Sequence, residues 1–187
     1  MSTLIIPFAG NTPAIAPDAF IAPNATVIGD VAIGAGSSIW YGCILRGDYN
    51  IIRIGARTNI QDGSVVHIDS RTSGAIIGDD VTIGHMCLIH ACTLESGCFV
   101  GNKATVMDGA VVESGAMVAA AALVTPNKRV PSGELWAGSP ARKLRDLTPE
   151  QRATLTLTAK AYAAFAQEHR AANAGLAPAG RIGNIGR

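Results

Sequence analysis

The sequence contains few charged residues, few aromatic residues and no long apolar run. Charged residues make up 16% of the 187-residue chain and aromatic residues 5%. Roughly 25% of a typical soluble domain is charged, and the low value here excludes a disordered chain or a charged coiled coil. The formal net charge of +1 predicts neither a nucleic acid nor a membrane as partner. Because no run of about 18 apolar residues occurs, we expect no membrane span.

The cysteines give no sign of a disulfide framework. Cys43, Cys87, Cys92 and Cys98 form no C-x-x-C pair, and a chain of this length does not need disulfide staples. The first seven residues, 1–7, lack the basic start and the long apolar run of a signal peptide. We therefore predict a cytoplasmic protein with reduced thiols.

A six-residue repeat dominates the sequence. An aliphatic residue opens nearly every unit, with two interruptions and one slip of the frame. A period of six fits neither an α-helix nor an alternating strand. It fits a triangular coil in which three units, each a short strand and a corner, stack on the next coil at about 4.8 Å. The opening residues are Ile21, Val27, Ile33, Ile39, Leu45, Ile54, Ile60, Val66, Ile77, Ile83, Ile89, Leu94, Val100, Val106, Val112, Val118, Val124, Val130 and Trp136.

The fifth position of each unit is mostly small, which suits a crowded inner corner. Cys87 occupies this position, so we expect its thiol in the core, and Thr93 occupies it in the unit that opens at Ile89. Cys92 falls outside the pattern. A zinc cluster of Cys87 and Cys92 with neighbouring histidines is an alternative, which the inward direction expected of Cys87 disfavours.

The periodicity divides the chain. We predict an N-terminal lead-in over residues 1–20, the solenoid over 21–141, a linker and a C-terminal helix over 142–170, and a disordered tail over 171–187.

The expected helix begins near Thr148, where residues 148–151 form a capping box with proline at the first helical position. An apolar stripe follows, made of Leu155, Ala159, Tyr162 and Ala166. On sequence alone, packing is a more natural role for Tyr162 than catalysis. His169 is expected to be exposed or to interact with the helix dipole.

Counting units places two histidines above one another. His67 and His90 each directly follow an opening residue, and three units separate them if residues 70–76 bulge outward. They should then lie on one face about 4.8 Å apart, close enough to share one metal ion at about 2.0–2.1 Å. His85 lies one unit before His90, on a different face. It could reach the same metal only from a neighbouring subunit of a three-fold trimer.

The same counting places polar residues beside the histidines. Arg46 falls in the column of His67, whereas Gln61 and Asp62 fall in that of His85. A plain surface pair between Arg46 and Asp48, worth about 0–1 kcal/mol, is the alternative for those two residues.

These motifs together resemble the γ-class carbonic anhydrases and their bacterial homologues. The resemblance covers about residues 8 to 165 and includes the segment 136–142, which is similar to the one that closes the coil in that family. It rests on Arg46-Gly47-Asp48, Gln61-Asp62-Gly63, His67, Gly84-His85 and His90.

The resemblance implies an all-β solenoid, a left-handed parallel β-helix with a C-terminal α-helix, assembled as a homotrimer. It implies reversible hydration of CO2 to bicarbonate at a zinc ion shared between subunits, with Fe2+ or Co2+ as other metals that imidazole suits. The implied metal ligands are His67 and His90 from one subunit and His85 from the next. The other implied site residues are Arg46, Asp48, Asp62 and Gln61, of which Gln61 would orient the attacking hydroxide.

The sequence departs from the archaeal prototype of that family at the glutamates that serve proton transfer. Tyr49 follows Asp48, and the loop 69–74 contains no glutamate. Tyr162 is the candidate for a helix tyrosine near the metal. Two other functions stay open: an acyltransferase or thioester-related enzyme acting on CoA esters, with one histidine as base, and a non-catalytic trimeric module with a vestigial metal site.

Overall fold

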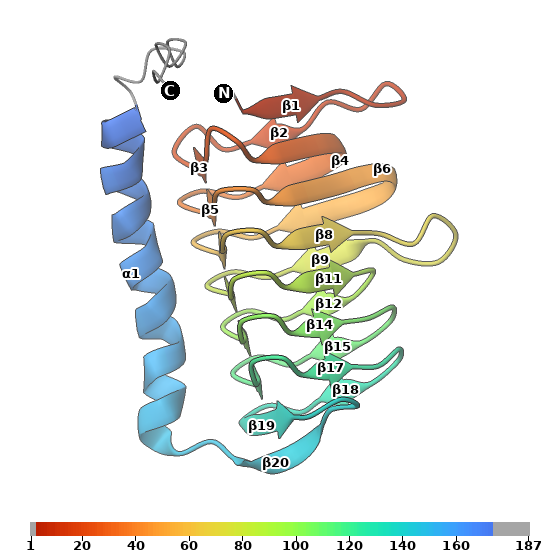
Figure 1. Cartoon of the computed structure of the whole chain (residues 1–187), viewed down its shortest axis with the longest axis vertical. Coiled ribbons are helices and arrows are strands. Elements are labelled where there is room, and N and C mark those ends of the chain that lie inside the picture. The colour runs from red at the N-terminus through yellow and green to blue at the C-terminus, as the bar shows by residue number, and fades with distance from the viewer. Residues whose placement is uncertain (1–2, 174–187) are drawn as a thin grey trace, which may run out of the picture.

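The computed structural model describes residues 3–173 and confirms the left-handed parallel β-helix, with one helix lying along its side (Figure 1). The strands are β1 (Leu4–Ile6), β2 (Ala14–Ile15), β3 (Phe20–Ile21), β4 (Thr26–Ile33), β5 (Ser38–Ile39), β6 (Ile44–Ile54), β7 (Asn59–Ile60), β8 (Val65–His67), β9 (Ala75–Ile77), β10 (Thr82–Ile83), β11 (Leu88–His90), β12 (Thr93–Leu94), β13 (Phe99–Val100), β14 (Thr105–Val106), β15 (Val111–Val112), β16 (Met117–Val118), β17 (Leu123–Val124), β18 (Arg129–Val130), β19 (Glu134–Ala137) and β20 (Arg142–Asp146). The helix is α1 (Pro149–Asn173), and no helix within residues 3–173 is long and apolar enough to cross a membrane.

The solenoid has three faces. The first face contains β8, β11, β14 and β17, and the second contains β9, β12, β15 and β18; the long strands β4 and β6 run through both, so the two faces form one sheet. The third face is a separate sheet in the order β20-β19-β16-β13-β10-β7-β5-β3. We call the corner where β8 and β11 end the exit edge, and the corner between β10 and β11 the entry edge. These two edges flank the first face.

Aliphatic residues at the opening positions fill the interior. On the first face, Leu45, Val66, Ile89 and Val106 lie in register on successive coils, and none is exposed to solvent. Stacking identical positions at the strand spacing buries each side chain against its equivalents above and below. The six-residue pattern therefore identified the core correctly, except at Ile21 and Trp136, which are half-buried.

The slip of the frame has a local structural cause. The corner after His90, which contains Ala91 with a φ of 45°, is one residue shorter than the regular corners. Cys92 is consequently 3% exposed and points into the core, whereas Thr93 is half-buried on the outside. The predicted positions of these two residues were therefore wrong. Cys87 and Cys92 are both buried free thiols, and within residues 3–173 no cluster of cysteine and histidine ligands forms, so that alternative is wrong as well.

The solenoid begins before residue 21, within the segment 1–20 that was predicted to be a lead-in. Both β1 and β2 pair in parallel with β4, so the first coil includes residues before Ile21. A turn closed by hydrogen bonds between Phe8 and Asn11 separates the two strands. That turn interrupts the six-residue pattern, which is why the sequence does not reveal this coil.

The predicted boundaries also differ at the C-terminal end. Instead of a linker, β20 pairs antiparallel with β19 and ends the third sheet. Helix α1 continues three residues beyond the predicted end at 170. Of the predicted tail, residues 174–187 lie outside the described part of the chain.

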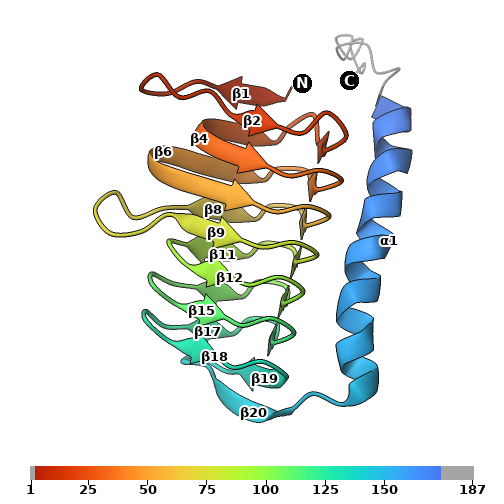
Figure 2. The same cartoon turned by 180° about the vertical axis from the view of Figure 1, so that it is seen from behind.

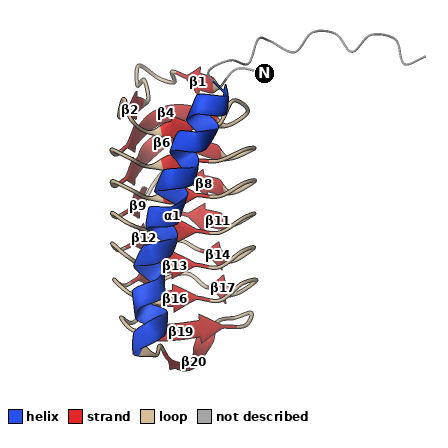
Figure 3. Ribbon diagram, turned by 90° about the vertical axis from the view of Figure 1, so that its left-hand side faces the viewer, coloured by secondary structure: helices blue, strands red, loops and turns tan. Residues whose placement is uncertain are grey.

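Helix α1 covers the third face (Figures 2 and 3). The capping box is formed as predicted: the backbone N–H of Gln151 donates to Thr148 Oγ1 at 3.3 Å, and the backbone N–H of Thr148 donates to Gln151 Oε1 at 3.2 Å. Of the predicted stripe, Leu155, Ala159 and Ala166 are buried. The stripe therefore docks the helix on the sheet, alongside the entry edge.

Candidate metal site at two edges of the solenoid

His67 and His90 lie one above the other at the exit edge, because β8 and β11 pair with these two residues in register. Arg46 pairs with His67 on the coil before, so the column predicted by counting units is confirmed. The two imidazoles meet, with His67 Nδ1 3.2 Å from His90 Nε2.

An ion pair lies beside His67. The Arg46 guanidinium binds the largely buried carboxylate of Asp48, and Asp48 Oδ1 is 3.4 Å from His67 Nε2. Partial burial opposes ionisation of Asp48, but the hydrogen bond and the charge of Arg46 outweigh it and lower the pKa of that carboxyl. Gly47 lies between Arg46 and Asp48 in the sequence. A Cβ at this position would lie 2.8 Å from the backbone oxygen of Asp30, so only glycine fits.

The surroundings of His67 favour the neutral form of its imidazole. Burial first, and then the positive charge of Arg46, lower the pKa of His67 below its usual value. Its Nε2 is buried, and in the described part of the chain its polar neighbour is Asp48 Oδ1 at 3.4 Å, which does not meet hydrogen-bond geometry. The contact of Nε2 with Asp48 is therefore a long charge interaction within the protein.

His90 has a carboxylate partner that the sequence analysis missed. Asp108 Oδ1 lies 2.9 Å from His90 Nδ1. The sequence does contain a signal for this contact. Val106 stacks on Ile89, so Asp108, two residues after Val106, reaches the corner beneath His90. No motif marked it.

His85 lies apart from this pair, in the turn at the entry edge, as the counting predicted. Its Nδ1 is 2.9 Å from Asp62 Oδ2, and both side chains are partly exposed. Gln61, by contrast, is buried, and its Nε2 donates to Asn59 Oδ1 at 3.0 Å. Within residues 3–173, no three side chains of His, Cys, Asp or Glu gather to hold a metal ion. A single copy therefore brings together two of the three predicted ligands.

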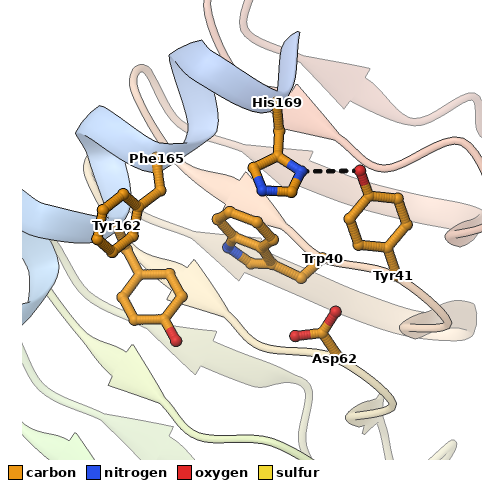
Figure 4. Close-up of a pocket in the computed structure, with 6 residues that line it drawn as sticks. All are labelled: Trp40, Tyr41, Asp62, Tyr162, Phe165 and His169. Atoms are coloured by element: carbon orange, nitrogen blue, oxygen red, sulfur yellow. Dashed lines mark hydrogen bonds between the residues drawn. The ribbon is translucent and has the colours of Figure 1, made fainter. Parts of the chain in front are cut away.

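Tyr162 projects from α1 toward the entry edge. It lines a pocket of about 280 Å³ together with Asp62 and four aromatic or imidazole side chains (Figure 4): Trp40, Tyr41, Phe165 and His169. Its ring packs edge-on against Trp40, with centroids 5.4 Å apart. Burial, and then the charge of Asp62, raise the pKa of Tyr162, so its phenol stays protonated at neutral pH.

His169 is exposed, as expected, and it also contacts the solenoid. Its Nδ1 lies 2.9 Å from the Tyr41 hydroxyl, and its ring centroid is 4.9 Å from that of Trp40. Asn173 also donates to the Tyr41 hydroxyl, at 3.2 Å. These contacts attach the last turns of α1 to the solenoid.

The loop 69–74 carries no free acid beside the histidine pair. Asp69 Oδ1 accepts hydrogen bonds from the backbone N–H groups of Arg71 and Thr72 at 2.9 and 2.8 Å, and from the Thr72 hydroxyl. These bonds lower the pKa of Asp69. Asp69 therefore shapes the loop, and Tyr49, which is exposed and packs edge-on against Phe8, lies where the prototype has a glutamate.

Comparisons with known proteins agree with this fold and these motifs. No family model matches the chain. It is 55% identical over 169 residues to Gamma carbonic anhydrase 1, mitochondrial, of Arabidopsis thaliana, covering 88% of this chain and 62% of that protein. It is 38% identical over 175 residues to protein YrdA of Escherichia coli (strain K12), covering 90% of this chain and 95% of YrdA. A solved structure of a hexapeptide transferase family protein from Anaplasma phagocytophilum matches with a TM-score of 0.86 at 49% identity, covering 89% of this chain and 98% of that chain.

The fold and the Anaplasma structure define a hexapeptide-repeat protein. Within that class, the chain belongs to the γ-carbonic anhydrase-like family, as its motifs indicated. The members that are named γ-carbonic anhydrases are lyases. The chain spans about three fifths of the length of the Arabidopsis protein, 62%.

Proposed function

We propose that this chain is a metal-dependent carbonic anhydrase of the γ class, which hydrates CO2 reversibly at a site completed between subunits of a homotrimer. The observation that carries the proposal is the contact between His67 and His90 at one edge, with His85 held apart at the other. We also propose a cytoplasmic location, although the named Arabidopsis relatives are mitochondrial.

The residues present fit a zinc ion. Two nitrogen ligands of a tetrahedral zinc at 2.0–2.1 Å are about 3.3–3.4 Å apart, and His67 Nδ1 and His90 Nε2 are 3.2 Å apart. The lowered pKa of His67 favours the neutral imidazole that a metal ligand must be. His67 and His90 of one subunit and His85 of the next would hold the ion. Zinc held by three histidines acts as a Lewis acid and lowers the pKa of a water molecule that it binds.

Other side chains near the histidines would orient the attacking water, donate a hydrogen bond and bind bicarbonate. Gln61 donates through Nε2 to Asn59, so its Oε1 is left to accept a hydrogen bond from the attacking water. The protonated phenol of Tyr162 can donate a hydrogen bond at the entry edge, close to Asp62. At the exit edge, the ionised pair of Arg46 and Asp48 offers a guanidinium for bicarbonate.

The first face supports assembly of three copies. Ile44, Val65 and Leu88 lie in register along it and point outward, and Ile44 is 41% exposed. Burying this apolar column around a three-fold axis would bring the exit edge of each copy to the entry edge of the next. That arrangement would close the distance between His85 and the histidine pair.

A second function is favoured by one comparison, because the Anaplasma relative is named a hexapeptide transferase family protein. In this alternative, one histidine acts as a general base on a CoA ester. The two functions differ in their need for a metal, because acyl transfer of that kind requires none.

Metal analysis combined with two activity assays tests the proposal. Protein purified without chelator should contain about one zinc ion per chain and should hydrate CO2 in a stopped-flow assay. Removing the metal should abolish hydration, and reloading with Zn2+ should restore it. A metal-free protein that releases thiol from acetyl-CoA would contradict the proposal and favour the transferase. A zinc-loaded trimer that is inactive in both assays would identify a non-catalytic module.

A further inference from the structure

The contact between His90 and Asp108 lies outside every motif of the sequence. We propose that Asp108 is a positioning residue that holds a proton on Nδ1 of His90 and so keeps Nε2 of that imidazole free to bind a metal ion. The inference rests on the metal site of the proposed function.

The chemistry of the two groups fixes the tautomer. An ionised carboxylate can only accept hydrogen bonds, so Nδ1 of His90 must carry the proton in its 2.9 Å contact with Asp108. In a neutral imidazole the other nitrogen is then unprotonated. That nitrogen, Nε2, is the one that faces His67 Nδ1 at 3.2 Å. Asp108 thus presents a lone pair toward the place where His67 and His90 meet.

The backbone, rather than the carboxylate, holds Asp108 in its turn. The N–H of Ala110 donates to the oxygen of Met107 at 3.0 Å, and the N–H of Gly109 donates to the oxygen of Ala91 at 2.8 Å. Gly109 has a φ of 65°, a left-handed conformation that favours glycine. In the described part of the chain, the carboxylate of Asp108 makes its one hydrogen bond with His90. Its removal should therefore leave the turn intact.

The same arrangement recurs at His85. There too a carboxylate, that of Asp62, lies 2.9 Å from Nδ1 and leaves Nε2 free. Carboxylates bonded to the distal nitrogen of a metal-ligating histidine orient the ring and raise its basicity, and their loss typically costs about 10–100-fold in metal affinity. Asp108 would perform for His90 what Asp62 performs for His85.

Two readouts on full-length Asp108→Ala and Asp108→Asn test the role, with Asp18→Asn as a control that removes one exposed carboxylate elsewhere. The first is 15N NMR of the metal-free protein, which reports the tautomer of His90. The second is zinc affinity, measured by competition with a chromophoric chelator. Asp108→Ala should lose the Nδ1–H tautomer and weaken zinc binding about 10–100-fold. Asp108→Asn keeps an acceptor and should lose less, and Asp18→Asn should match wild type.

The outcomes separate this inference from the proposed function. If wild type binds zinc and both Asp108 variants bind it equally tightly, the positioning role is wrong and the metal site stands. If wild type binds no zinc, the proposed function fails, and the tautomer of metal-free His90 then decides the role of Asp108 alone. Should Asp108→Ala not fold, the Asp108→Asn comparison with Asp18→Asn carries the same test.

Discussion

Two inactive variants should restore each other when they are mixed, if the metal site is shared between subunits. In one copy, His67 and His90 lie together at the exit edge, whereas His85 lies at the entry edge. His67→Ala and His85→Ala should therefore each be inactive alone, because every site in either homotrimer lacks one ligand. In a mixed trimer, some boundaries join an intact exit edge to an intact entry edge.

The expected recovery follows from the three-fold symmetry. A boundary is complete when the subunit that supplies the exit edge is His85→Ala and the next subunit is His67→Ala. With equal and random mixing, each condition holds for half of the subunits, so about one boundary in four is complete. CO2 hydration and zinc content should return to about a quarter of wild type in the whole mixture, and to about a third in trimers isolated because they contain both chains.

The assay unfolds the two variants together, refolds them and isolates trimers that contain both chains, identified by two different affinity tags. The matched control mixes His67→Ala with His90→Ala. Both substitutions lie at the exit edge, so every boundary still lacks one ligand and no activity should return. Absence of recovery in well-folded mixed trimers of His67→Ala and His85→Ala would refute the shared site. Equal recovery in the control would refute the assignment of His67 and His90 to one edge.

Three further outcomes test the fold. Ile60→Ala removes a fully buried side chain and should lower the free energy of unfolding by about 2–5 kcal/mol, whereas Ile76→Ala, on the outer surface of β9, should change it by about 0.5 kcal/mol or less in urea titrations. Thr148→Ala removes the N-cap of α1 and should cost about 1 kcal/mol; the mid-helix change Thr154→Ala serves as its control. Burial raises the pKa values of all four cysteine thiols, so Ellman's reagent should label them only as fast as the protein unfolds, and rapid labelling of the native protein would contradict their burial.

The sequence predicts the regular part of the fold because every coil repeats the same constraint. An aliphatic residue at the opening of each unit has equivalents above and below it. A unit that departs from the pattern can therefore still be assigned from the units on either side. The prediction fails where the repeat is broken: at the turn between β1 and β2, at the short corner after His90, and at β20. At each of these places the hydrogen bonding of the backbone, rather than the periodicity, determines the path of the chain.

The candidate site likewise has features that the sequence predicts and features that it does not. Counting units places His67 over His90 and Asp62 beside His85, because strand pairing fixes which residues lie in one column. It does not reveal the contact of Asp108 with His90, which depends on how the shortened corner at Ala91 turns. Nor does it show which nitrogen of each imidazole faces its neighbour, because side-chain orientation is set by corner geometry and by hydrogen-bond partners.

The geometry of a stacked solenoid explains why a metal site in this fold should need a second copy. Side chains in one column point in the same direction and repeat at about 4.8 Å, so a column offers ligands in a line. A tetrahedral ion requires ligands from several directions. His67 and His90 converge enough to supply two of them, but the next position of their column, Arg46, is a cation bound to Asp48. A third ligand would then have to approach from outside the column, and in the proposed assembly His85, on the other side of the apolar first face, would do so when copies pack through that face. Metal affinity and assembly should consequently rise and fall together: diluting the protein until the trimer dissociates should release zinc at the same protein concentration.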